Sequence, residues 1–210
     1  MKRANSDAQK EERRLSILAK AQDALDAQDY REIRLQDLAA GIGLVKGSFY
    51  RYFPTKQDLF MTLYVRELEA WLADWGGRFA DGAADPGRLE TALMDSLAAR
   101  PRLIRLIGGF PGDLEPELSD AGLRSYKRFM REYLARSARA LGTLNLKLAD
   151  RAVPFLVSLF VLVQGSAPLC YPVARVAGIL REEADFAIFR FDFRQLMAPL
   201  LRAVFAAYFP

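Results

Sequence analysis

A short basic stretch near the start of the chain carries side chains suited to binding a polyanion. Lys46, Ser48, Tyr50 and Arg51 supply two cations and two hydroxyls, and no aspartate or glutamate occurs between positions 37 and 58. An outward helical face without acids is what entry into the major groove of DNA requires. These residue types predict contacts to phosphates and base edges rather than bond-breaking chemistry.

The composition excludes most catalytic and metal-binding chemistry. The chain has no histidine and a single cysteine, Cys170, which rules out Ser-His-Asp and Cys-His catalysis, imidazole metal sites and internal disulfides. The acidic pairs Glu115/Glu117 and Glu182/Glu183 lie in polar segments, without the burial that tunes a catalytic carboxyl. We therefore expect no enzymatic activity, no cofactor and no metal. The net charge of +4 is compatible with nucleic acid but does not by itself indicate it.

Two short helices around a glycine turn are needed to position the basic stretch. Helices are predicted over residues 35–40 and about 45–52, and Gly43 lies between them, where a tight turn needs a residue free of Cβ strain. On the second helix, the face expected to pack inward carries Val45, Phe49, Tyr52 and Phe53. The opposite face then presents the basic stretch, in the layout of a helix-turn-helix.

Helical periodicity continues through the rest of the chain. A first helix is predicted over residues 14–27, with residues 1–13 as a frayed polar arm leading into it. Thr55, with Asp58 three residues later, is typical of the start of a helix, here predicted over residues 56–75. Further helical blocks are predicted over residues 87–99, 102–108, 119–141, 148–165 and 182–208, and the sequence allows a break before Asp192 and a kink at Pro199 in the last of them.

The expected fold is all-α, with an N-terminal three-helix domain over residues 1–55 and a larger C-terminal helical domain over residues 56–210. The uncharged run 152–174 raises the question of a membrane span, but its apolar half is only about half of the ~20 residues that a span needs. Gly165 and Pro168 follow, which favours a buried helix and then a turn. Without an apolar segment at the N-terminus, a cytoplasmic protein with no membrane partner is expected.

Residues 14–60 resemble the DNA-binding head of the TetR family of bacterial transcriptional regulators. The run Lys-Gly-Ser-Phe-Tyr-Arg-Tyr-Phe-Pro-Thr-Lys at 46–56 carries most of the resemblance, together with Ile17 and Ala21 in the first helix and Asp-Leu-Ala at 37–39. The rest of the chain is similar to the family only in its length and helical pattern. The resemblance implies a helix-turn-helix head on a divergent ligand-binding domain.

The resemblance also implies roles for individual residues. Lys46 and Ser48 fall at recognition-helix positions expected to touch bases, and Tyr50, Tyr52 and Lys56 at positions expected to hold phosphates. The DNA-contacting residues expected on all these grounds are Arg34, Gln36, Val45, Lys46, Gly47, Ser48, Tyr50, Arg51, Tyr52 and Lys56.

Four positions depart from the family pattern. Val45 stands where a Ser or Thr usually caps the recognition helix, a loss of about 1 kcal/mol of capping. Arg34 stands where a Thr cap is common, Asp29 stands where a Gly is common, and Ile42 replaces a small Ala. These differences affect the base contacts more than the fold.

Aromatic and polar side chains in the larger domain are candidates for a ligand pocket. Aromatic residues at helical spacing are more often plain core, so both readings stay open for them. Gln164 fits a ligand contact, a satisfied buried amide or a dimer contact equally well, and Arg105 could pair with an acidic ligand. The candidate pocket residues are Trp71, Arg105, Tyr126, Met130, Tyr133 and Gln164.

The helices 148–165 and 192–208 are more apolar than the core of one chain needs. Surplus apolar helix surface indicates a partner, and two-fold dimers are the commonest case. In the resembled family, two such helices from each protomer form a four-helix bundle. The residues predicted for a homodimer interface are Phe155, Leu159, Leu196, Leu200, Val204 and Tyr208.

The sequence therefore predicts a DNA-binding transcriptional regulator. The expected mechanism is a repressor that binds a palindromic operator as a homodimer and is released by a small hydrophobic or aromatic effector. The alternative is a helical protein-interaction adaptor that does not bind DNA.

Overall fold

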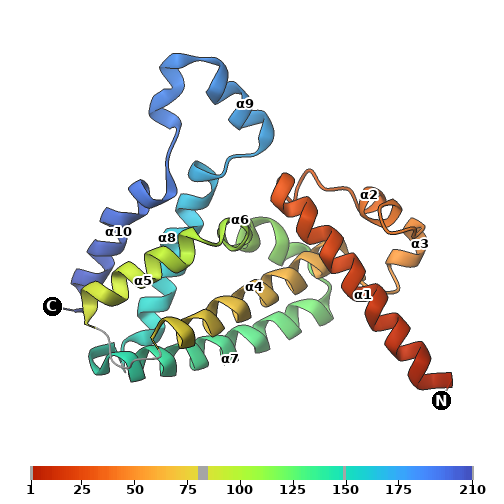
Figure 1. The fold of residues 1–210 in the computed structure, drawn as a ribbon, viewed down its shortest axis with the longest axis horizontal. Coiled ribbons are helices and arrows are strands. Elements are labelled where there is room, and N and C mark those ends of the chain that lie inside the picture. The colour runs from red at the N-terminus through yellow and green to blue at the C-terminus, as the bar shows by residue number, and fades with distance from the viewer. Residues whose placement is uncertain (1, 80–84, 149, 210) are drawn as a thin grey trace.

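The computed structural model describes residues 2–79, 85–148 and 150–209, and all regular structure in these ranges is helical. The predicted all-α fold class is confirmed (Figure 1). The α-helices, in chain order, are α1 (Lys2–Ala27), α2 (Leu35–Ala40), α3 (Lys46–Phe49), α4 (Lys56–Arg78), α5 (Pro86–Ala98), α6 (Pro101–Gly109), α7 (Asp120–Leu144), α8 (Ala152–Cys170), α9 (Ala174–Glu182) and α10 (Phe193–Tyr208).

The first three helices form a small head with its own core. Ile17 of α1, Leu38 of α2 and Phe49 of α3 are all buried, and Phe53 joins them after α3. The turn between α2 and α3 depends on Gly43, whose φ of +68° lies in the left-handed region that disfavours residues with a Cβ. The prediction for this position is confirmed.

A capped helix start connects the head to the rest of the molecule. The Thr55 hydroxyl accepts a hydrogen bond from the Asp58 backbone N–H at 2.9 Å, which caps α4 as predicted. The Asp58 carboxylate is buried and also accepts from the hydroxyl of Ser119, the N-cap of α7. A Cβ at Gly122 would lie 2.0 Å from that carboxylate, so the two helix starts approach closely only with glycine there.

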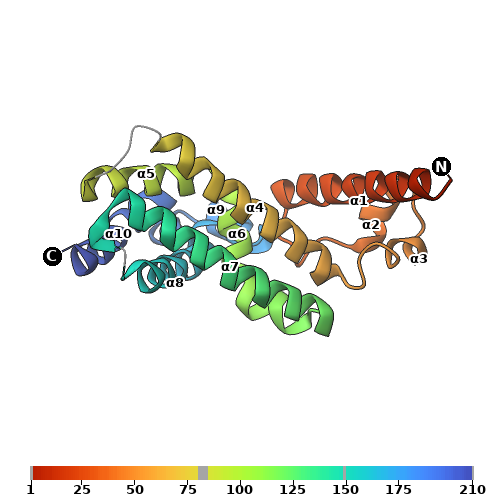
Figure 2. The same cartoon turned by 90° about the horizontal axis from the view of Figure 1, so that it is seen from below.

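The remaining helices form a larger body. α4 runs from the head into the body beside α7, and α8 packs on α6, α7 and α10 (Figures 1 and 2). The core of the body is aromatic and leucine-rich, with Trp71, Trp75 and Tyr133 almost fully buried. α1, α2 and α3 lie together at one end of the molecule (Figure 2).

Two arginines of α6 fasten the head to the body. Arg102 donates to Asp26 near the end of α1 at 2.9 Å and to Glu67 of α4 at 2.7 Å. Arg105 donates to the Leu25 backbone carbonyl at 2.8 Å, which satisfies one of the open carbonyls at the C-terminal end of α1. The end of α1 is therefore bound by side chains of the body.

Several predicted boundaries are wrong. α1 begins at Lys2, so residues 2–13 continue the helix rather than forming a frayed arm. α8 continues past Gly165 and Pro168 to Cys170, because a proline in the last turn removes only one helical hydrogen bond. The block predicted over residues 182–208 does break before Asp192, the N-cap of α10, but its first part is divided between the end of α9 and a 3₁₀ helix.

α8 is the helix among the described residues whose length and composition would allow it to cross a membrane. In the structure it packs against three other helices, and 33% of its most apolar window is buried within the subunit. α8 therefore contributes one side to the core of the body, while much of its remaining surface is not covered by the subunit.

Candidate DNA-binding surface

The face of α3 opposite its buried phenylalanines is open to solvent. Phe49 is fully buried, whereas Gly47 is exposed, Tyr50 is 45% exposed and Arg51 is exposed. The two phenylalanines lie on the inward face as predicted, but Val45, predicted on the same face, is exposed because it precedes α3, and Tyr52 is only half-buried. The Lys46 side chain lies outside the described residues, although its backbone begins α3.

The start of α3 has no side-chain cap, because valine offers no hydrogen-bond acceptor. Val45 occupies the N-cap position and is 73% exposed. Inside the turn, the Arg51 guanidinium donates to the Ser48 hydroxyl at 3.1 Å. Ser48 and Arg51 thus present one polar pair, next to an apolar side chain able to contact a thymine methyl group.

The structure brings together candidates that are far apart in the sequence. Arg34 and Gln36, at the start of α2, line one surface hollow of about 450 Å³ with Tyr50 and Lys56. Arg34 and Gln36 are both exposed. Side chains at the start of α2 and after α3 can therefore contact the same strand of a nucleic acid.

Lys56 is partly buried against the segment that precedes α2. Its ammonium donates to the Arg31 carbonyl at 3.4 Å and lies 5.2 Å from the centre of the Tyr30 ring. Burial lowers the pKa of Lys56, and the nearby carboxylates of Asp29 and Glu117 oppose that shift. Lys56 is thus a fixed, half-buried cation at the edge of the hollow.

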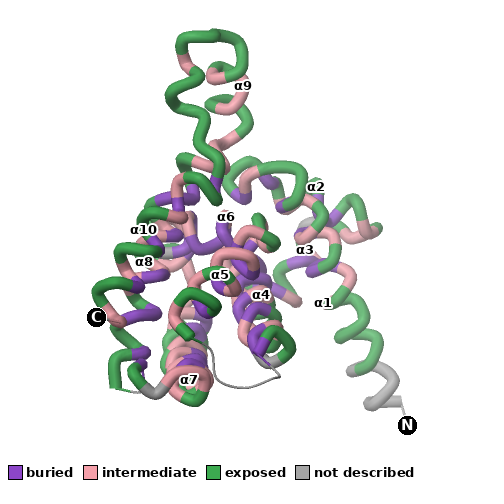
Figure 3. The backbone as a smooth tube through the Cα atoms, turned by 60° about the vertical axis from the view of Figure 1, so that its left-hand side comes forward, coloured by how far each residue is buried: buried purple, intermediate pink, exposed green. Residues whose placement is uncertain are grey.

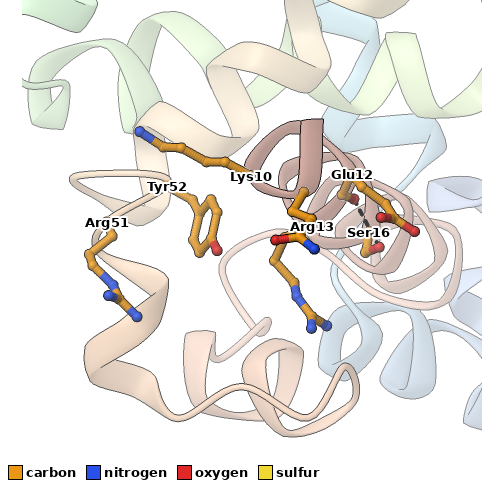
Figure 4. Close-up of a pocket in the computed structure, with 7 residues that line it drawn as sticks. Lys10, Glu12, Arg13, Ser16, Arg51 and Tyr52 are labelled. Carbon is orange, nitrogen blue, oxygen red and sulfur yellow. Dashed lines mark hydrogen bonds between the residues drawn. The ribbon is translucent and has the colours of Figure 1, made fainter. Parts of the chain in front are cut away.

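A second hollow reveals residues that the sequence reasoning missed. Arg51 and Tyr52 line a hollow of about 750 Å³ together with Lys10 and Arg13 of α1 (Figure 4). Arg13 also donates to the Ile42 carbonyl at 3.3 Å, which connects α1 to the turn before α3. The only signal in the sequence was the basic residues themselves, in a segment expected to fray.

The predicted ligand-pocket residues are mostly packed against other side chains. The Trp71 indole donates to the Ser96 hydroxyl at 2.9 Å, and Tyr126 stacks on Phe110 with ring centres 4.4 Å apart. Tyr133 is fully buried, while Met130 and Gln164 are half-buried.

Arg105 has a different role from the one considered for it. Its guanidinium donates a hydrogen bond to the Leu25 carbonyl and lies 5.4 Å from the centre of the Tyr171 ring. With these partners, Arg105 belongs to the junction between head and body rather than to the interior among the aromatic residues.

The residues predicted for a dimer interface are divided between core and surface. Phe155 and Leu159 are at most 1% exposed, so they pack within their own subunit. Leu200 is 38% exposed. Leu196, Val204 and Tyr208 are half-buried.

Sequence reasoning missed the outward stripe of α8. Val153, Val157 and Val161 recur every four residues on one face and are 42%, 47% and 61% exposed. Val153, Val157 and Val161, rather than the buried Phe155 and Leu159, therefore form the uncovered face of α8.

Comparison with known families covers both parts of the chain. A family model described as "Bacterial regulatory proteins, tetR family" matches residues 17–63. A second, described as "Tetracyclin repressor-like, C-terminal domain", matches residues 65–206, which is more than half of the chain.

Individual relatives agree with the family models. The chain is 39% identical over 56 residues to the HTH-type transcriptional regulator EthR of Mycobacterium tuberculosis, covering 27% of this chain and 26% of that protein. It is 40% identical over 53 residues to EthR of Mycolicibacterium smegmatis, covering 25% and 24%. The match thus spans about a quarter of the length of these curated relatives.

A solved structure extends the likeness of the fold to the whole chain. The fatty acid degradation regulator FadR from Bacillus halodurans matches with a TM-score of 0.53 at 16% identity, over 93% of both chains. At that identity the likeness concerns the fold alone. With both family models matched in order along the helical fold, the chain belongs to the TetR family of helix-turn-helix transcriptional regulators.

Proposed function

We propose that this regulator is a cytoplasmic repressor that binds a palindromic operator as a homodimer and leaves it when a small effector binds. The observation that carries the proposal is the acid-free outward face of α3, held over a buried pair of phenylalanines. Residues 1–55 are the DNA-binding unit in this proposal, and residues 56–210 bind the effector and dimerise.

The exposed residues of the head suggest a division of labour on DNA. Ser48 is assigned to base edges and Val45 to a thymine methyl group, since neither side chain is buried in the core. Lys46 is assigned to base edges from its position in the sequence. Gly47 has open space around a Cβ position, which lets the backbone approach the groove. Tyr50 and Arg51 are assigned to phosphates.

The flanks of α3 extend the phosphate contacts. Arg34, Gln36 and Lys56 line the hollow on one side, and Tyr52 lines the other together with Arg13. Contacts on both sides of a recognition helix fix its register on the duplex, while the base contacts give specificity.

The outward faces of α8 and α10 supply the dimer interface in this proposal. Val153, Val157 and Val161 form an exposed apolar stripe on α8, and Leu200 is exposed on α10. Burial of such a stripe is favourable at roughly 25 cal/mol per Å² of apolar surface. An isologous pairing of these helices would place two heads on successive major grooves.

Buried polar atoms between α4 and α7 support an effector site in the body. Trp75 Nε1, Tyr133 Oη and Ser137 Oγ are buried and make no hydrogen bond of full geometry among the described residues, although the Tyr133 and Ser137 hydroxyls lie close enough to interact with each other. Each such atom loses hydrogen bonds to water without replacement, which costs about 1–3 kcal/mol. A small hydrophobic or aromatic effector with one or two polar atoms would satisfy them when the helices part.

Selection of bound fragments from the source genome tests the proposal for the head. The expected result is enrichment of duplexes containing an inverted repeat, with binding lost in Tyr50→Ala and kept in Arg139→Ala, an exposed change on α7. If no fragment is enriched at low salt, the adaptor alternative without DNA binding stands instead.

Effector binding has its own readout in the body. The two tryptophans of the chain, Trp71 and Trp75, both lie on α4 beside the unpaired polar atoms. An effector that enters there should change tryptophan fluorescence and release DNA at the same concentration. Release of DNA with unchanged fluorescence would place the effector elsewhere.

A further inference from the structure

The chain between α8 and α10 forms a projecting arm, residues 172–192, that has no core of its own. It contains α9 and a 3₁₀ helix over Ala184–Phe189, and it extends away from the body (Figures 1 and 3). No residue of the arm is buried. An element with this much apolar surface needs a covering partner.

The arm is an insertion into an otherwise complete helix pair. The rings of Tyr171 and Phe193, on either side of it, are only 6.2 Å apart between centres. Below them, the Ser166 hydroxyl donates to the sulfur of Met197 at 3.1 Å, so α8 and α10 pack directly on each other. The pairing of these helices does not need the arm, and the arm must serve something else.

The arm nevertheless holds a definite shape. The Arg190 side chain donates to the backbone carbonyls of Leu180 at 2.6 Å and Glu183 at 3.0 Å, which ties the 3₁₀ segment to α9. The rings of Phe186 and Phe189 meet edge to face, 6.3 Å apart. A preformed arm loses less conformational entropy on binding than a flexible loop would.

The two sides of α9 face different surroundings. Ala174, Ala177 and Arg181 share one side and line a hollow of about 320 Å³ with the end of α1. Val176 and Ile179 lie on the opposite side and are each 43% exposed. Val176 and Ile179 therefore turn away from their own subunit, whereas the partly exposed Phe189 and Phe191 border a second hollow of about 320 Å³ with Leu169 at the base of the arm.

The exposed apolar side chains of the arm continue the exposed stripe of α8. Val153, Val157, Val161 and Leu169 lead along α8 to the base of the arm. Ten of the thirteen large hydrophobic residues recorded as exposed in the described chain lie between residues 153 and 200. Half of these ten belong to the arm: Val176, Ile179, Ile188, Phe189 and Phe191.

This continuity identifies the partner. A stable interface takes roughly 800 Å² from each partner, about 20–30 residues a side, and the stripe on α8 and α10 alone offers few large side chains. We propose that each arm packs its apolar side on a second copy of this chain, beside the paired α8 and α10 helices. The inference rests on the homodimer of the proposed function.

The side of the arm that faces α1 links the proposed contact with the partner to the position of the head. Because Ala174, Ala177 and Arg181 border the end of α1, an arm fixed on the partner also limits the space open to its own head. The partner would then restrain a head indirectly, by holding the arm of the same subunit beside it. This restraint would add to the contacts of α6 with the end of α1.

Sedimentation equilibrium of full-length variants tests the proposal. Phe189→Asp should raise the dimer dissociation constant about 30-fold or more, the effect of a central interface residue. Ala184→Asp adds the same charge at a small exposed residue of the arm and should leave the constant close to that of the unmodified chain. An unchanged constant in Phe189→Asp overturns the proposal.

A second variant covers the case in which Phe189→Asp misfolds. Replacing residues 173–191 by a short Gly-Ser linker should keep the fold, because Tyr171 and Phe193 are already adjacent, and should weaken the dimer at least as much. A dimer of undiminished stability without the arm would show that the arm does not grip the partner.

A variant of α8 separates this inference from the dimer on which it rests. Val157→Asp should give monomers, in which amide hydrogen exchange of residues 174–191 is at least about tenfold faster than in the dimer. Equal exchange in dimer and monomer refutes the arm contact alone. A full-length chain that is monomeric at micromolar concentration refutes the dimer as well.

Discussion

The salt dependence of operator binding is a quantitative test of the recognition surface. Four basic residues belong to it in each subunit, namely Arg34, Lys46, Arg51 and Lys56, so a dimer presents eight. If each neutralises one phosphate, the slope of log K against log salt concentration is about −7. Raising the salt from about 50 to 200 mM should then weaken binding about 10⁴-fold.

Arg51→Ala removes two of the eight cations from the dimer. Its side chain is exposed and hydrogen-bonded only locally, to Ser48, so the truncation leaves the head core intact. The expected slope falls to about −5.4, and the same rise in salt should weaken binding only about 10³-fold. Further contacts from Lys10 and Arg13 would steepen both slopes and leave their difference at about 1.8.

Fluorescence anisotropy of a labelled duplex, recovered by the genomic selection, measures both slopes. Arg139→Ala is the matched control, because it lowers the net charge equally at an exposed site on α7 in the body. Its slope should equal that of the unmodified chain. If Arg51→Ala keeps the full slope, Arg51 does not meet phosphate and the assignment of this face of α3 is wrong.

Three further changes test the fold and the coupling. Gly43→Val should destabilise the protein by about 1–2 kcal/mol because of its positive φ, seen as a lower thermal midpoint. Thr55→Ala should cost about 1 kcal/mol of stability in urea titration through loss of the α4 cap. Arg102→Gln loses Asp26 and Glu67 and should reduce effector-induced operator release about three- to tenfold, with tryptophan fluorescence still reporting binding.

The head could be predicted from the sequence because its signals are local. A glycine at the turn, a Thr55–Asp58 cap and two inward phenylalanines each act within a few residues, and the structure shows all of them. The part of the site that was missed, Lys10 and Arg13, depends on α1 running unbroken from Lys2. The local sequence pattern does not show how far a polar helix extends when contacts with other parts of the fold determine its length.

The C-terminal third was harder to predict because its apolar residues serve different neighbours. Residues 182–192 fall within a predicted helical block, but Ile188, Phe189 and Phe191 lie exposed in the arm and before α10. Phe155 and Leu159 read as an interface, but they face the subunit core. Apolar periodicity identifies a buried side without saying which chain covers it, so interface and core look alike in one sequence.

In the proposed mechanism, the contacts of α4 carry the effect of a ligand bound in the body to the head. Glu67 holds Arg102, which also holds Asp26 at the end of α1, and Glu67 lies one turn before Trp71 on α4. A ligand that parts α4 from α7 to reach Tyr133 must move that turn and change the geometry at Arg102. Because the Arg102 side chain is only 20% exposed, water replaces its lost partners poorly. The end of α1 therefore follows α4, and a preference of a few kcal/mol for the parted state suffices to misplace the head.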